Sequence, residues 1–386
     1  MSAEDSLRYR SRGRWITASK VLPLLIYVRN VYGLTRSPML AAMLRCRLVK
    51  RIRSLDGLRA ISISLVVVGH LTKAGLVPRL MANYAGTGVR IFFVISGYLI
   101  TTILLDEHAQ TSTINLRQFY IRRAYRILPA AAVFMLFAFV MYWHELRWYD
   151  IGAMLLYLAN FDGARPWMVA HLWSLGVEEQ FYFLWPSVLR KWYRQSIAIL
   201  LGVIVFAPIY SAACYHLKVP SGGYGTFPAV VDNLAIGCLL AIFGSRIPRI
   251  RPWAAFPMLL AVLLIPSYPA NTPARTLFML FVLWPILHCS IAGLVLHVIQ
   301  SPYRILNLAP VVWLGRISYS LYIWQEPFFF NPSRQPAYRL FLGIGLACLS
   351  YYLVEQPVLR LRDRKTTALQ SQTSDTALVM CEALQS

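Results

Sequence analysis

The sequence predicts an all-α membrane protein with about ten transmembrane helices and one short re-entrant or interfacial helix. The 386 residues are 58% hydrophobic and only 14% charged, with a mean hydropathy of +0.53, whereas a soluble domain of this length needs more charge on its surface. Apolar runs long enough to span a bilayer, roughly 17–25 residues, recur along the chain. The basic residues that give the net charge of +22 lie in short segments between these runs, which indicates cytoplasmic loops rather than a nucleic-acid-binding surface.

The chain divides into a basic N-terminal tail (1–51), a membrane domain (52–360) and a polar C-terminal tail (361–386). We expect both tails to be cytoplasmic and the C-terminal one to be disordered. The apolar stretch 21–28 is too short to span. It could form an interfacial amphipathic helix, be disordered, or precede a later start codon. The first 20 residues lack the apolar segment of a cleavable signal peptide.

Ten apolar segments are interpreted as spans: 58–77, 88–105, 128–143, 171–189, 196–214, 229–244, 253–268, 276–298, 308–330 and 338–358. A further apolar piece, 150–161, is too short to cross alone. If it does not cross, the dense basic segments, among them 106–127 and 245–252, all lie on one side of the membrane. The positive-inside rule assigns that side to the cytoplasm, so both termini are predicted to be cytoplasmic.

Ionisable residues inside the first span point to a functional site, because each costs about 2.5–3.5 kcal/mol to insert. In "RSLDGLRAISISLVVVGHL", Arg59 and His70 are eleven residues apart, so they share one helix face at a separation of roughly 16 Å. Asp56 lies close to the same face. Asp56 and Arg59 could instead form an interfacial ion pair that anchors the helix, and a neighbouring carbonyl or hydroxyl could satisfy His70.

A second polar cluster lies in "HLWSLGVEEQFYFLWP". His171, Ser174 and Glu178 fall on one helical stripe at i, i+3 and i+7, and Glu179 lies on the adjacent face. Anchoring a helix does not require two adjacent carboxylates in an apolar segment. We therefore expect one of them to polarise His70 or to bind a substrate hydroxyl.

Two more segments add small residues and arginines. In "RIFFVISGYLI", close helix packing accounts for Gly97, whereas Ser96 could line a cavity. In "FYIRRAYRILP", Arg122, Arg123 and Arg126 lie at the predicted inner membrane face, where they could bind phosphate oxygens or anionic lipid headgroups. A donor substrate that carries phosphate groups could thus bind from the cytoplasm, with its reactive end near His70 toward the outer side.

Six motifs follow one another in an order that resembles the integral-membrane acyltransferase-3 family over residues 52–360: "SLDGLRAISISLVVVGHL", "GVRIFFVISGYLI", "FYIRRAYRILP", "HLWSLGVEEQFYFLWP", "GRISYSLYIWQEP" and "YYLVEQPV". Members of that family O-acylate polysaccharides, peptidoglycan, antibiotics and other glycans. The resemblance matches Arg59 and His70 to the family's Arg-x10-His element, and Arg123 and Arg126 to its Arg-x-x-Arg element. It implies that His70 is the catalytic base and that the arginines hold the acyl-CoA pyrophosphate. It also implies a site lined by Ser96, Gly97, Glu178 and Glu179.

The chain departs from the family pattern in two places. Many members have a histidine after the residue equivalent to Trp324, whereas this chain has Gln325. The chain therefore lacks one histidine that could have served as a second base beside His70 or as a substrate contact. The segment "FPAVVDNLAIGCLLA" lacks a common upstream arginine but keeps Asp232 near the outer end of its span. We expect the acceptor-binding residues to be Asp56, His171, Ser174 and Asp232.

These observations predict an O-acyltransferase of the cell inner membrane that moves an acyl group, most often acetyl in this family, from cytoplasmic acyl-CoA to a hydroxyl of a glycan, glycolipid or glycosylated small molecule. Direct transfer is favoured over an acyl-enzyme on Ser96 or Ser174, because no Ser-His-Asp order can be assigned. No bound cofactor, metal or nucleic acid is expected, and the six cysteines are predicted to be small buried apolar residues rather than disulfides or metal ligands. The alternatives are a proton-coupled transporter or flippase and an inactive relative that serves as a partner subunit.

Overall fold

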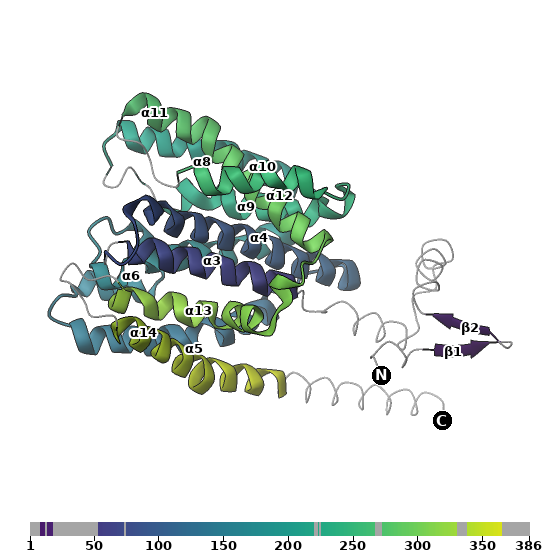
Figure 1. The fold of residues 1–386 in the computed structure, drawn as a ribbon, viewed down its shortest axis with the longest axis horizontal. Helices are drawn as coiled ribbons and strands as arrows, with labels where there is room; N and C mark the ends of the chain where they lie inside the picture. Colours follow the sequence, from purple (N-terminus) through teal and green to yellow (C-terminus); the bar gives the residue numbers. More distant parts are fainter. Residues whose placement is uncertain are drawn as a thin grey trace. The chain divides into compact units, whose positions relative to one another are not determined.

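The computed structural model (Figure 1) describes residues 8–11, 14–17 and 53–364, apart from internal gaps at 73–74, 220–222, 224, 267–271 and 330–337. The chain separates into two compact units, Met1–Arg51 and Ile52–Ser386. In the first unit, β1 (Arg8–Ser11) and β2 (Arg14–Thr17) form an antiparallel hairpin that the sequence did not predict. The stretch 21–28 lies outside the described residues.

The described part of the second unit consists of helices joined by loops, without a strand, which confirms the predicted fold class. Each predicted span corresponds to a helix or to consecutive helices: α3 (Arg53–Leu71), α4 (Tyr84–Thr111), α5 (Leu116–Tyr142), α7 (Leu172–Lys191), α8 (Ser196–His216), α9 (Phe227–Phe243), α10 (Pro252–Leu264), α11 (Pro273–Phe278) with α12 (Trp284–Gln300), α13 (Ala309–Phe329) and α14 (Tyr338–Leu349). Segments of π-helix join α11 to α12 (Met279–Leu283) and extend α14 (Ser350–Glu355). The short predicted helix is α6 (Trp148–Leu155).

Among the described residues, seven helical segments are long and apolar enough to cross a membrane. The segment at α10 is apolar but has only 13 residues. In contrast, α7 and α13 have 20 and 21 residues, so they are long enough but too polar to be among the seven. A polar helix inside a membrane bundle needs protein neighbours for its polar groups. These two helices therefore belong to the interior, where a site can form.

Glycines bring the central helices into direct contact. Figure 1 shows α3 and α4 side by side in the middle of the bundle, and α4 packs on α9 while α3 packs on α13. A Cβ on Gly97 would overlap the carbonyl oxygen of Leu234, and a Cβ on Gly237 would overlap that of Val94. Gly97 thus has a packing role at the contact of α4 and α9, and a contact between Gly97 and the acyl donor stays a prediction.

Replacing Gly97 with alanine is expected to push α4 away from α9 and to destabilise the protein by about 1–3 kcal/mol, the usual cost of overpacking. The matched control is Gly202→Ala on α8, because a Cβ there meets nothing within 4 Å. Since alanine favours helix over glycine by up to about 1 kcal/mol, the control should be as stable as the wild type or more so. Thermal unfolding in detergent measures both variants, and equal midpoints would contradict the close packing.

The segment around α6 is closed by one arginine and anchored to α7. Arg147 donates to both oxygens of Asp150, from Nε at 2.9 Å and from Nη2 at 2.6 Å, and its Nη2 lies 3.1 Å from Asp162 Oδ2. The side-chain amide of Gln180 donates to the Tyr157 carbonyl at 2.8 Å. Residues 147–162 therefore form a compact hairpin-like segment that docks on α7 without crossing the bundle.

The closure by Arg147 should depend on pH. Its hydrogen bonds hold the pKa of Asp150 below the ordinary value of 3.8, so the stabilisation is present at neutral pH and is lost as the pH falls below about 4. Hydrogen–deuterium exchange of residues 148–164, corrected for the intrinsic exchange rate, should show this loss of protection in the wild type. In Arg147→Gln, protection should be lower at neutral pH and should change little on acidification. A wild-type segment that stays equally protected below pH 4 would argue against this closure.

Candidate active site

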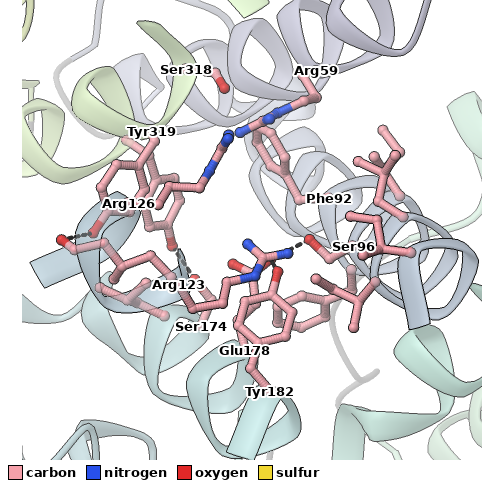
Figure 2. A pocket seen from close by; sticks show the side chains of 18 of the residues that line it. Arg59, Phe92, Ser96, Arg123, Arg126, Ser174, Glu178, Tyr182, Ser318 and Tyr319 are labelled. Atoms are coloured by element: carbon pink, nitrogen blue, oxygen red, sulfur yellow. Dashed lines mark hydrogen bonds between the residues drawn. The ribbon is translucent and has the colours of Figure 1, made fainter. Parts of the chain in front are cut away.

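A cavity of about 280 Å³ opens among α3, α4, α5, α7 and α13 (Figure 2). Its wall combines apolar side chains such as Phe92 and Leu175 with many polar ones. The polar residues that line it are Arg59, Ser96, Arg122, Arg123, Arg126, Ser174, Glu178, Tyr182, Ser318, Tyr319, Tyr322 and Arg362. Several sequence motifs far apart in the chain thus meet at one place. By the predicted topology, the arginines lie toward the cytoplasmic end of this cavity.

One wall is formed by a stripe of α7. Ser174, Glu178 and Tyr182 all line the cavity, as their spacing of four residues predicts for one helix face. The hydroxyls of Ser96 and Tyr182 both donate to Oε1 of Glu178, and Figure 2 shows the three side chains together. Two hydroxyl donors from two helices fix the orientation of this carboxylate and expose it to the cavity.

Arginines of α3 and α5 form a second, cationic wall, which meets the α7 stripe at Tyr182. Figure 2 shows the guanidinium groups of Arg59 and Arg126 pointing toward one another. Arg126 is within electrostatic range of both Arg59 and Arg123, and Arg123 lies 4.2 Å above the centre of the Tyr182 ring. In the part of the chain that the structure describes, Arg59, Arg123 and Arg126 form no ion pair with a carboxylate. The buried carboxylate of Glu355 lies within electrostatic range of Arg59 and Arg126 without forming a direct ion pair. Three arginines that line one cavity without a direct ion pair are a binding site for an anion.

The other predicted catalytic residues lie outside the cavity lining. His70 is at the far end of α3, three helical turns from Arg59 and roughly 16 Å along the helix axis. Glu179 follows Glu178, and its Oε1 is buried without a hydrogen bond among the described residues. Glu179 interacts electrostatically with Tyr157 and Tyr319. A catalytic role for His70 or Glu179 stays a prediction.

The deep end of the cavity is closed by a hydrogen-bonded group on α7 and α13. The hydroxyls of Ser174 and Tyr322 are 2.5 Å apart, and Tyr322 also donates to the His171 carbonyl at 2.9 Å. The His171 ring lies just beyond, with its Nδ1 2.8 Å from Oε2 of Glu326, and both side chains are buried. Tyr322 and Glu326 belong to the motif "GRISYSLYIWQEP", but the sequence alone predicted no role for them.

Asp56 and Asp232 lie elsewhere in the bundle. Asp56 is buried on α3 at the point where Gly315 of α13 approaches its backbone. Asp232 Oδ2 is 2.9 Å from Nδ1 of His288, and Nε2 of His288 is 2.5 Å from Arg90. This buried cluster joins α4, α9 and α12 away from the cavity.

Arg90 and His288 were not predicted as site residues, although each is an ionisable residue inside an apolar run, which is a visible sequence signal. Among the described residues, no group of three or more His, Cys, Asp or Glu side chains could hold a metal ion. Four described cysteines are unpaired thiols, and Cys289 is exposed rather than buried.

Comparisons of the sequence with known proteins identify the family of this chain. A family model for the acyltransferase domain (acyltransferase 3) matches residues 52–355. YrhL of Bacillus subtilis, which carries the provisional name of a peptidoglycan O-acetyltransferase, is 30% identical over 358 residues, covering 80% of this chain and 55% of its own length. The peptidoglycan O-acetyltransferase OatA of Listeria monocytogenes is 28% identical over 365 residues, covering 80% of this chain and 56% of its own.

The chain thus spans little more than half the length of these curated relatives. No solved structure matches it. The family match covers the unit that holds the cavity, together with most of its arginines and its α7 stripe. The chain therefore belongs to the acyltransferase-3 family of integral-membrane proteins.

Proposed function

We propose that this protein is an O-acyltransferase that moves an acetyl group from cytoplasmic acetyl-CoA to a hydroxyl of a glycan. The observation that carries the proposal is the cationic wall of Arg59, Arg123 and Arg126, three arginines that line one cavity and form no direct ion pair with a carboxylate among the described residues. Acyl-CoA is a polyanion, and arginine forks bind its phosphates through charge-assisted hydrogen bonds. The apolar part of the lining suits the uncharged arm that carries the thioester.

The chemistry is a direct acyl transfer. The acceptor oxygen attacks the thioester carbonyl carbon, a C–O bond forms, and the C–S bond breaks. His70 takes the hydroxyl proton, and the coenzyme A thiolate leaves and regains a proton. An acyl-enzyme is less well supported, because within the described residues neither Ser96 nor Ser174 forms a hydrogen bond with a histidine side chain.

The relatives support the class of acceptor. YrhL and OatA are named for peptidoglycan, a polymer of sugars with free hydroxyls. We infer a glycan acceptor of this kind on the outer side of the cell inner membrane. The basic segments on one side of the bundle support the matching orientation, with both termini and the donor in the cytoplasm.

The test uses the full chain, purified in nanodiscs, with acetyl-CoA labelled in the acetyl group and de-O-acetylated peptidoglycan fragments as acceptor. We expect label to appear on the fragments with release of one free thiol per transferred acetyl group. Arg123→Gln should lose this activity at low acetyl-CoA and regain part of it at high acetyl-CoA. Movement of glycan across a vesicle membrane without consumption of acetyl-CoA would favour the flippase and overturn the proposal.

A further inference from the structure

Helix α13 carries buried polar groups that have no partner in the part of the chain described. The side chain of Gln325 is fully buried, yet neither its amide nitrogen nor its amide oxygen forms a hydrogen bond. The adjacent Trp324 is 5% exposed, and its indole N–H is also unbonded. A buried polar group without a hydrogen-bond partner costs free energy unless a water or a ligand supplies the missing hydrogen bond. A fully buried primary amide with no bond at either end therefore indicates a place for a polar ligand.

A third unbonded group faces the same region from α7. His171 is buried, and its Nδ1 lies 2.8 Å from Oε2 of Glu326, which follows Gln325 on α13. Its other nitrogen, Nε2, forms no hydrogen bond among the described residues. The rings of His171 and Trp324 pack edge-on against the same ring, Phe134, at 5.5 and 5.6 Å. His171 and Trp324 thus share one aromatic neighbour, and Gln325 follows Trp324 on α13. We name these three residues the outer polar cluster.

The outer polar cluster begins where the cavity ends. Tyr322 lines the cavity and lies one turn of α13 before Gln325 and Glu326. Its hydroxyl bonds to both Ser174 and the His171 backbone, so a single hydrogen-bonded layer separates cavity from cluster. By the predicted topology, the cavity opens to the cytoplasm and the cluster lies on the extracytoplasmic side of this layer.

The packing of α13 on α3 also brings the cluster near His70. The two helices contact each other and run in the same direction (Figure 1). Gly315 meets the backbone of Asp56, so ten residues further along both helices Gln325 reaches about the level of Val66. His70 lies one turn beyond Val66. The cluster is therefore at the depth where the proposed base lies.

We propose that Gln325, Trp324 and His171 bind the polar groups of the glycan acceptor, so that the outer polar cluster is the acceptor subsite. This inference rests on the proposed acyl transfer and names residues that select its second substrate. The Gln325 amide both donates and accepts, which suits sugar hydroxyls and N-acetyl groups, and the indole of Trp324 donates. The Glu326 carboxylate lies 2.8 Å from Nδ1 of His171 and favours the proton on that nitrogen, so Nε2 is left to accept a hydrogen bond from an acceptor hydroxyl.

The test compares Gln325→Leu and Trp324→Phe with the wild type, all as full chains in nanodiscs. De-O-acetylated peptidoglycan fragments are varied at saturating acetyl-CoA. Each variant should raise the KM for the fragments about 10-fold and leave the KM for acetyl-CoA unchanged, since only acceptor hydrogen bonds are lost. Gln325→Leu should also melt at or above the wild-type temperature, because it removes a buried amide that lacks partners. The matched control, Ser290→Ala, removes a buried hydroxyl on α12 and should change neither KM.

A second readout does not depend on turnover. The peptidoglycan fragments should raise the melting temperature of the wild type and raise it less in both variants. If wild-type transfer is normal and both variants keep the wild-type KM and stabilisation by fragments, the acceptor subsite is overturned while the proposed function stands. If the wild type consumes no acetyl-CoA, the proposed function fails, and the loss or retention of fragment stabilisation in the variants still decides the subsite.

Discussion

Replacing Arg126 with glutamine should make the donor-free protein more stable to heat and at the same time weaken its binding of acetyl-CoA. Arg126 lies within electrostatic range of Arg59 and Arg123, whose repulsion outweighs the weaker attraction of the Glu355 carboxylate, and it forms no direct ion pair with a described carboxylate. In the empty cavity these like charges repel one another and have lost part of their hydration. Neutral glutamine relieves this repulsion, so the melting temperature of the empty protein should rise.

The same change removes one cationic contact with the donor phosphates. Hydrogen bonds to charged groups contribute about 1.5–3 kcal/mol each, so the Kd for acetyl-CoA should rise about 10- to 100-fold. The increase should shrink at high salt, because screening weakens the remaining arginines as well. Isothermal titration with acetyl-CoA and thermal unfolding without it measure the two effects on the same preparation.

Arg117→Gln is the matched control for this prediction. Arg117 is on the same helix, α5, but it is exposed and does not line the cavity. Its replacement should change neither the melting temperature of the empty protein nor the Kd for acetyl-CoA. If Arg126→Gln lowers the melting temperature and leaves donor affinity intact, Arg126 stabilises the fold and the cationic wall is not a donor site.

Much of the helical architecture could be predicted because each helix in a bilayer has to be an apolar run of fixed minimum length. The piece at 150–161 was placed correctly as a short helix for the same reason, and α6 has only eight residues. The π-helical hydrogen bonding within two of these helical segments was not predicted. The π segments Met279–Leu283 and Ser350–Glu355 add a residue to a turn without changing hydropathy, and so leave no signal in an apolar sequence.

The site was predictable where its residues repeat along one helix. Ser174 and Glu178 share a stripe of α7, and Arg123 and Arg126 lie one turn apart on α5, so periodicity alone placed each pair together. The contacts between helices were not predictable in this way. Ser96 meets Glu178 across 82 positions of sequence, and Ser174 meets Tyr322 across 148, because helix packing sets those distances.

The role of His70 gives the largest expected effect on rate. His70→Gln should lower the rate of acetyl transfer about 10²- to 10⁴-fold, the usual contribution of a general base. Because His70 does not line the cavity that holds the arginines, the Kd for acetyl-CoA should stay at the wild-type value. Rapid mixing with labelled acetyl-CoA separates the transfer rate from donor binding. His108→Gln is the matched control, since His108 stacks on Tyr193 at 4.2 Å and lies outside the cavity lining.

Two histidines compete for the role of base, and their surroundings predict different responses. The His171 ring is held between Glu326 and the edge of Phe134, so His171→Gln should disturb acceptor binding and raise the KM for the glycan. His70→Gln should instead lower kcat with little change in either KM, because a base acts on the proton only in the transition state. The reverse pattern, with kcat lost in His171→Gln and retained in His70→Gln, would move the base to His171. The Glu326 carboxylate would then stabilise the imidazolium, and Arg59 and His70 would no longer mark the two ends of one reaction path.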